Sequence, residues 1–138
     1  KQDLEKVSSL INPIHYAMMT TRGGNDLPSR PMAAPKIDLE NKNLWFFTNQ
    51  CSQKCQELES DNSANVSFMD PGSNTFVSFV GQSEICKDKR KMEELWDTNL
   101  KQWFPKELDD PNLCLLKFNI QGLEFWDNEK DAHKAFEL

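Results

Sequence analysis

The sequence predicts a mainly β fold, an antiparallel barrel of six strands with peripheral helices, built as one domain over residues 1–138. Three observations predict this fold. Six segments are rich in β-branched and aromatic residues or alternate apolar with polar side chains, as strands do. Most of these segments are joined by short turns rich in Gly, Asn, Asp and Pro, which is typical of hairpins. A regular alternation of strands with helices is absent, so a doubly wound parallel sheet is disfavoured.

The individual elements follow from local patterns. Apolar residues recur at helical spacing in the N-terminal segment 1–11, which predicts an amphipathic helix over residues 2–11. Pro31 and Pro35 cannot donate ladder hydrogen bonds, so their strand should be bulged or lie at an edge. Gly81, inside the longest of the first five strands, predicts a bulge or bend. The expected strands span residues 14–21, 29–38, 44–48, 64–70, 75–86 and 113–126, and the further helices span 52–60, 88–103 and, as a polar helical tail, 128–138.

Composition disfavours several classes of function. The net charge of −6 disfavours nucleic acid as a partner, because affinity for nucleic acid comes chiefly from neutralising phosphates. The basic run Lys87–Lys91 is interpreted as a solvated face. No apolar run approaches the roughly 18 residues of a membrane-spanning helix, and the charged N-terminus is unlike a secretory signal. Because four cysteines are too few and too scattered for a disulfide scaffold, a reducing cytoplasm is the expected location.

The stretch 44–56, "LWFFTNQCSQKCQ", predicts an anion site. A strand ends at Thr48, a short turn follows, and Ser52, Gln53 and Lys54 open the expected helix. Free main-chain N–H groups, the positive end of a helix dipole and a nearby ammonium all favour a phosphate. In the alternative, Ser52 only caps the helix and Lys54 lies in water, and this stretch taken alone favours that alternative.

The faces of two strands shift the balance towards a ligand. Alternation along residues 29–38 places Arg30 beside small and apolar neighbours, where it is either a surface salt-bridge partner or a fixed cation facing a slot. An apolar slot, a cation and a phosphate cradle together suit a flat, phosphorylated aromatic cofactor. The face of Arg30 also holds Met32, Ala34 and Lys36, and the next strand sets Leu44, Phe46 and Thr48 on one side with Trp45 and Phe47 on the other.

Four motifs occur in a specific order along the chain: "SRPM", "LWFFTNQCSQK", "FVSFVGQSEI" and "WFPKELDDPNLCLLKFNIQGLEFWD". Their order resembles that in the FMN-binding split barrels related to pyridoxamine 5'-phosphate oxidase, over about residues 10–127. The ending is most similar to the general stress protein branch of that family. The resemblance implies a six-stranded split β-barrel that buries FMN between the two subunits of a homodimer.

The resemblance implies roles for residues around the flavin ring. Arg30 would face the pyrimidine edge of the isoalloxazine, where reduced flavin accumulates negative charge. Pro31 and Met32 would pass along the ring with main-chain contacts. Phe47 and Thr48 would line the ring and the ribityl chain, again partly through the main chain.

The resemblance also implies roles at the phosphate and at the subunit interface. Ser52, Gln53 and Lys54 match the Ser-Arg-Lys that binds the flavin phosphate in the oxidases. Gln82 would approach the flavin from the second subunit or at the ring edge, and Trp126 would reach it across the dimer interface. No catalytic side chain and no metal ligand are implied.

Two departures from the family pattern limit the expected activity. Gln53 stands where the oxidases carry arginine, which removes a fixed charge from the phosphate site and predicts weaker FMN binding. The oxidases continue past "EFW" with arginine and histidine residues that grip the substrate phosphate, whereas this chain continues "DNEKDAHKAFEL" with His133 as the one histidine. Pyridoxamine phosphate oxidation is therefore not expected. The function stays open between an FMN-dependent oxidoreductase of unknown substrate and a flavin carrier or sensor in a stress response, and a larger flavin or a deazaflavin could replace FMN.

Other candidate residues are interpreted as structural. Cys51 and Cys55 lie four residues apart and could share a helix face as metal ligands, but no second pair matches them, so ordinary thiols are favoured. His15, in an apolar strand, is more often a wall residue than a base. Trp96 and Trp103 are expected in the core, with a pocket-rimming position as the alternative for Trp103.

Overall fold

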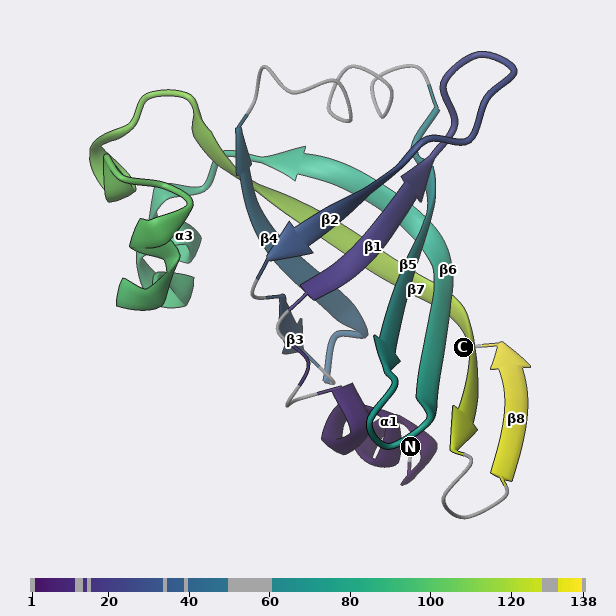
Figure 1. Cartoon of the computed structure of the whole chain (residues 1–138). Helices are drawn as coiled ribbons and strands as arrows, with labels where there is room; N and C mark the ends of the chain where they lie inside the picture. The colour runs from purple at the N-terminus through teal and green to yellow at the C-terminus, as the bar shows by residue number, and fades with distance from the viewer. Residues whose placement is uncertain are drawn as a thin grey trace.

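The computed structural model describes residues 2–11, 14, 16–33, 35–38, 40–49, 61–127 and 132–137. These residues form one curled antiparallel sheet, a half-barrel with helices outside it (Figure 1). The elements are α1 (Gln2–Ile11), β1 (Tyr16–Thr21), β2 (Ser29–Ala33), β3 (Lys36–Asp38), β4 (Asn43–Asn49), β5 (Ser63–Asp70), β6 (Thr75–Cys86), α3 (Lys89–Leu95), the 3-10 helices η1 (Thr98–Gln102) and η2 (Glu107–Asp109), β7 (Leu113–Asp127) and β8 (Ala132–Glu137). The strands follow one another across the sheet in the order β2-β1-β5-β6-β7-β4-β3, and β8 pairs with β7.

The half-barrel confirms the predicted fold, with eight strands among the described residues in place of the expected six. The expected strand 29–38 is divided into β2 and β3, and Pro35 lies between them. A proline cannot donate a ladder hydrogen bond, which accounts for the break there. β2 is an edge strand that pairs with β1 alone, so Pro31 is accommodated at the edge as predicted.

The C-terminal helix predicted over 128–138 is wrong, because residues 132–137 form β8. β4 pairs with β7 only between Leu113 and Asn119. The remainder of that edge of β7 would otherwise expose its main-chain groups, and β8 pairs with it over residues 122–127. Tertiary pairing therefore outweighs the helical pattern of this polar segment.

The helix predicted over 88–103 is interrupted. α3 ends at Leu95, and η1 begins at Thr98 after two extended residues. The side chain of Asp97 accepts a hydrogen bond of 2.9 Å from the main-chain N–H of Asn99 and so caps the start of η1.

A β-bulge lies where Gly81 predicts one. The register between β6 and β7 shifts between Val80 and Gly81. A Cβ atom at position 81 would collide with the main-chain carbonyl oxygen of Asn119. Glycine is therefore required at this position by the close approach of two backbones.

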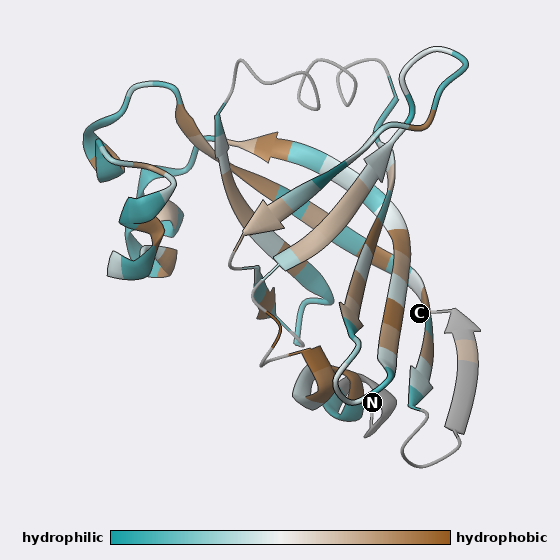
Figure 2. Cartoon of the chain, viewed as in Figure 1, coloured by the Kyte–Doolittle hydropathy of each residue, from teal (hydrophilic) through white to brown (hydrophobic). Residues whose placement is uncertain are grey.

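The core is divided between the two faces of β4. Leu44 and Phe46 point into the barrel, while Trp45 and Phe47 point outwards under α3 and η1. This alternation confirms the two faces predicted for the strand. Figure 2 shows brown apolar and teal polar segments alternating along the strands, as expected of a sheet with one face in the core.

Helix α1 covers residues 2–11 as predicted and closes the lower end of the barrel in Figure 1. Val7 and Ile11 are buried in the barrel core. Lys6 lies 3.7 Å from the buried carboxylate of Asp127 and over the ring of Phe125, so α1 is held at the end of β7. Within the described residues, no helix is both long and apolar enough to cross a membrane.

Candidate functional site

The expected cofactor site falls partly outside the described residues. Ser52, Gln53 and Lys54, and the helix predicted over 52–60, lie outside them, as do Cys51, Cys55 and His15. The phosphate end of the expected site therefore stays a prediction. The structure places the other candidate residues: Arg30, Pro31, Met32, Phe47, Thr48, Gln82 and Trp126.

β2 and β4 approach each other without pairing. Within the described ranges, β2 pairs with β1 alone, and β3 covers β4 only from Asn43 to Trp45. From Phe46 onwards, β4 has no neighbouring strand on that edge among the described residues. Residues of β2 and β4 nevertheless lie within 8 Å of one another, Cα to Cα, and Figure 1 shows β2 running up to β4. We call this unpaired junction of β2 with the end of β4 the seam.

Arg30 is held in place at the start of β2. Its Nη1 donates a hydrogen bond of 2.7 Å to the Oγ1 of Thr21 and one of 3.3 Å to the carbonyl oxygen of Met19. Thr21 is buried, and Arg30 itself is half-buried on the same inward face as Met32. These two hydrogen bonds fix the orientation of the guanidinium.

Thr48 and Phe47 lie on opposite faces of β4 at the seam. The side chain of Thr48 is buried, and its Oγ1 has no hydrogen-bond partner among the described residues. Leaving such a group unsatisfied costs about 1–3 kcal/mol, so the position suits an added partner. The ring of Phe47 packs edge-on against Trp96 at 5.4 Å and near Phe104 at 6.4 Å, so any ligand at the seam would meet Phe47 through its main chain.

Gln82 and Trp126 share the outer face of the sheet but lie far apart. Trp126 of β7 is opposite Phe76 of β6. Phe76 precedes Gln82 by six positions along β6. At roughly 3.3 Å per strand residue, the two positions are about 20 Å apart. Gln82 lies where β5 begins, at the end of the half-barrel that also holds Thr21 and Arg30, whereas Trp126 lies near the opposite end (Figure 1). A single chain therefore does not bring Trp126 to the seam.

Exposed apolar side chains lie on the outer face of the sheet. Met18 of β1, Met69 of β5 and Val80 of β6 are exposed by 43–61%, although all are large hydrophobic residues. Met69, Phe76 and Trp126 follow one another across β5, β6 and β7 in one register row. An apolar patch of this kind on a sheet commonly marks an interface.

Sequence reasoning missed Thr21 and the open edge of β4. Thr21 alternates with Ala17 and Met19 on the inward face of β1, so its burial could have been inferred, but its pairing with Arg30 depends on the register with β2. Within the described part of the chain, no group of three or more His, Cys, Asp or Glu could hold a metal ion.

The chain belongs to the pyridoxamine 5'-phosphate oxidase-like family, whose model matches residues 2–138. This finding confirms the family that the motifs predict. The curated relative bli-3 of Neurospora crassa is 31% identical over 105 residues, which are 75% of this chain and 50% of that protein. The chain thus spans about half the length of this relative.

Solved structures share the fold over nearly the whole chain. A protein from Clostridium acetobutylicum related to general stress protein 26 of B. subtilis has a TM-score of 0.84 at 23% identity, covering 99% of this chain and 95% of its own. The general stress FMN/FAD binding protein of Xanthomonas citri has a TM-score of 0.81 at 24% identity, covering 100% and 98%. A haem binding protein from Mycobacterium smegmatis also shares the fold, with a TM-score of 0.77 at 10% identity over 97% of this chain and 57% of its own. The fold alone therefore does not select the cofactor.

Proposed function

We propose that this chain binds a flavin, FMN, at the seam between β2 and β4, and that two copies of the chain enclose it. The observation that carries the proposal is the seam itself. The two strands approach each other there without pairing; β2 carries a guanidinium fixed by hydrogen bonds, and β4 carries a buried hydroxyl without a partner among the described residues. A flat heterocycle with polar edges would satisfy such groups. Membership of the family and the flavin named for the Xanthomonas citri protein support the same choice.

The described residues fit the ring end of a flavin. Arg30 would bind and orient the pyrimidine edge and would stabilise the negative charge of the reduced ring. Main-chain groups of Pro31, Met32 and Phe47 would hold the ring, and the hydroxyl of Thr48 would gain a hydrogen-bond partner. A bound flavin would supply transfer of electrons or hydride, so the protein would need no acid or base of its own for that step.

The remaining roles depend on residues beyond the seam. Ser52, Gln53 and Lys54 would bind the flavin phosphate. Trp126 would come from the second subunit, because within one chain it lies about 20 Å along the sheet from the end that holds Arg30. Gln82, which lies at the same end as Arg30, would approach the edge of the ring. The apolar outer face supports a homodimer that covers Trp126.

We further propose a flavin-dependent oxidoreductase of the general stress protein type, acting in the cytoplasm on a substrate other than pyridoxamine phosphate. Cys86 is a free thiol, which suits a reducing compartment. A flavin carrier or sensor without turnover is the second candidate. It has the same binding site and differs only in whether a donor reduces the bound flavin.

The absorption spectrum of the purified protein tests the cofactor. A flavin spectrum and the mass of FMN in the released ligand are expected, together with a dimer by light scattering. A Soret band, or an unchanged apo-protein after titration with FMN, would contradict the proposal. Anaerobic addition of NADH or NADPH then separates the two candidates. Bleaching of the flavin band supports the oxidoreductase, and no bleaching with these or other common donors supports the carrier.

A further inference from the structure

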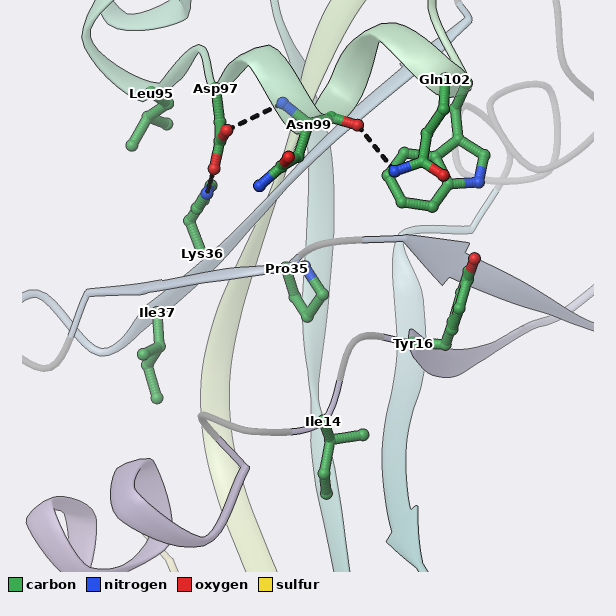
Figure 3. Close-up of a pocket in the computed structure, with 10 residues that line it drawn as sticks. Ile14, Tyr16, Pro35, Lys36, Ile37, Leu95, Asp97, Asn99 and Gln102 are labelled. Atoms are coloured by element: carbon green, nitrogen blue, oxygen red, sulfur yellow. Dashed lines mark hydrogen bonds and ion pairs between the residues drawn. The ribbon is translucent and has the colours of Figure 1, made fainter.

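A cavity of about 800 Å³ lies outside the barrel, between the start of β1, the strand β3 and the α3–η1 segment. Figure 3 shows its lining: η1 with Asn99 and Gln102 lies on one side, and Ile14, Pro35 and Ile37 lie on the other. This volume and this mixture of apolar, aromatic and few polar side chains are typical of sites for small molecules. None of the residues expected to bind the flavin is among the described residues that line the cavity.

Two aromatic rings border the cavity. Tyr16 and Trp103 lie edge to face with their centroids 5.8 Å apart, and both are accessible, Tyr16 by 52%. Exposed aromatic faces of this kind bind flat apolar rings. Trp103 lines the cavity and, like Trp96, also packs against the apolar cluster under α3 and η1, so the expected core position of both tryptophans is confirmed as well.

The charge of the described lining cancels. Lys36 contributes one positive charge and Asp97 one negative charge, and their Nζ and Oδ2 atoms lie 3.3 Å apart (Figure 3). The pKa of Asp97 is held below its usual range, first by the hydrogen bond from the main-chain N–H of Asn99 and second by Lys36. Asp97 is therefore ionised near neutral pH, and Lys36 does not present an uncompensated charge to the cavity.

Polar groups remain available to a neutral ligand. The side-chain amide of Asn99 and the hydroxyl of Tyr16 make no hydrogen bond to another described residue, and Figure 3 shows both reaching towards the space between η1 and β1. Gln102 Nε2 donates to the carbonyl oxygen of Asn99, which fixes one side of the rim. An amide and a phenol can pair with a carbonyl, amide or hydroxyl group on a ligand.

We propose that this cavity binds an uncharged, planar aromatic compound and discriminates against anionic ones, with Asp97 as the residue that sets this specificity. Describing the compound as the substrate rests on the proposed flavin function, whereas the binding itself does not. The discrimination arises because an anionic ligand would have to compete with Asp97 for Lys36. A neutral ligand leaves the ion pair intact and uses the amide of Asn99.

Two probes of equal shape test the proposal. Naphthalene-2-carboxamide is neutral and naphthalene-2-carboxylate is anionic, so their difference in affinity reports charge alone. Equilibrium dialysis with the full-length protein, with and without FMN, should show the amide binding more tightly by about threefold or more. Asp97→Asn keeps the helix cap and should raise the affinity for the carboxylate by about threefold while leaving that for the amide nearly unchanged. Asn99→Ala should lower the affinity for naphthalene-2-carboxamide by about threefold.

Glu93→Gln is the matched control, because it removes one negative charge from an exposed residue of α3 that does not line the cavity. It should change neither affinity. Absence of binding of the carboxamide at millimolar concentration would overturn the proposal. Equal affinities for the carboxamide and the carboxylate, both unchanged in the Asp97→Asn variant, would overturn it as well. Displacement of the amide by FMN would also overturn it, since the cavity would then be part of the flavin site. Amide binding by a protein that takes up no flavin would leave this proposal standing while contradicting the proposed function.

Discussion

The continuous sheet of β5, β6 and β7 differs sharply from the seam between β2 and β4. In the first region each strand pairs along most of its length, the inward side chains are buried, and even the bulge at Gly81 is closed by contact between two backbones. In the seam, strand edges lack a neighbouring strand among the described residues and the hydroxyl of Thr48 has no partner there. From this difference we infer that the paired sheet stabilises the fold and that the seam binds a ligand. Substitutions in the paired sheet should reduce stability, and substitutions at the seam should reduce ligand affinity.

The largest expected effect is on stability, from Gly81→Ala. The added methyl group would collide with the carbonyl oxygen of Asn119, and a backbone cannot move aside as a flexible side chain can. We expect a loss of about 3 kcal/mol in the free energy of unfolding. Urea denaturation measures it.

Gly72→Ala provides the control for this loss. Its added Cβ would lie 3.3 Å from the carboxylate of Asp70 in an exposed turn, so the change in the free energy of unfolding should stay within about 0.5 kcal/mol. Equal effects of the two substitutions would show that the bulge is not a point of close contact.

Arg30→Met should lower the affinity for the flavin. A hydrogen bond to a charged group contributes about 1.5–3 kcal/mol, so FMN affinity should fall by about tenfold to a hundredfold. Methionine keeps the apolar stem beside Met32, but the buried hydroxyl of Thr21 loses the hydrogen bond from Arg30, so the free energy of unfolding should also fall by about 1–3 kcal/mol. Fluorescence titration of apo-protein with FMN measures the affinity.

Arg22→Met removes the same charge from an exposed arginine that pairs with Asp61 at 3.8 Å. FMN affinity should not change in this variant. If Arg30→Met and Arg22→Met lower the affinity for FMN equally, the effect comes from net charge, and the seam is not the binding site.

Trp126→Ala should lower the affinity for FMN by about tenfold if the residue comes from the partner subunit. Mixed dimers give a sharper test. In a dimer of one Arg30→Met chain with one Trp126→Ala chain, exchange of Trp126 between subunits leaves one intact site and one doubly altered site. Titration should then show half the sites with native affinity. Two weakened sites, with no site of native affinity, would show that Arg30 and Trp126 act from the same chain.

The same contrast explains how much could be predicted from sequence. Alternation along residues 44–48 and the glycine at position 81 report local geometry, so the faces of β4 and the bulge were predicted correctly. The strand β8 was not predicted correctly. Its conformation depends on the open edge of β7 beyond Asn119, and that edge lies elsewhere in the chain. Likewise the sequence leaves Arg30 open between a surface salt-bridge partner and a fixed cation, because its acceptor Thr21 depends on the pairing of β1 with β2. The motifs predicted the family, and local patterns predicted most of the elements. The seam depends on where strand pairing ends, which local patterns do not show.

The smallest expected effect, and the one that separates the two regions most cleanly, comes from Thr48→Val. Valine has nearly the shape of threonine and removes a buried hydroxyl that has no partner among the described residues. In the paired sheet, loss of a hydrogen-bonded group would reduce stability. Here, the free energy of unfolding of the apo-protein should stay constant or rise slightly, since an unsatisfied polar group is lost. FMN affinity should fall by about fivefold, because the ligand loses one neutral hydrogen bond. Thr98→Val, at the exposed start of η1, should change neither quantity. A stabilised Thr48→Val protein that binds FMN as tightly as the native chain would show that the hydroxyl is a packing defect and plays no part in binding.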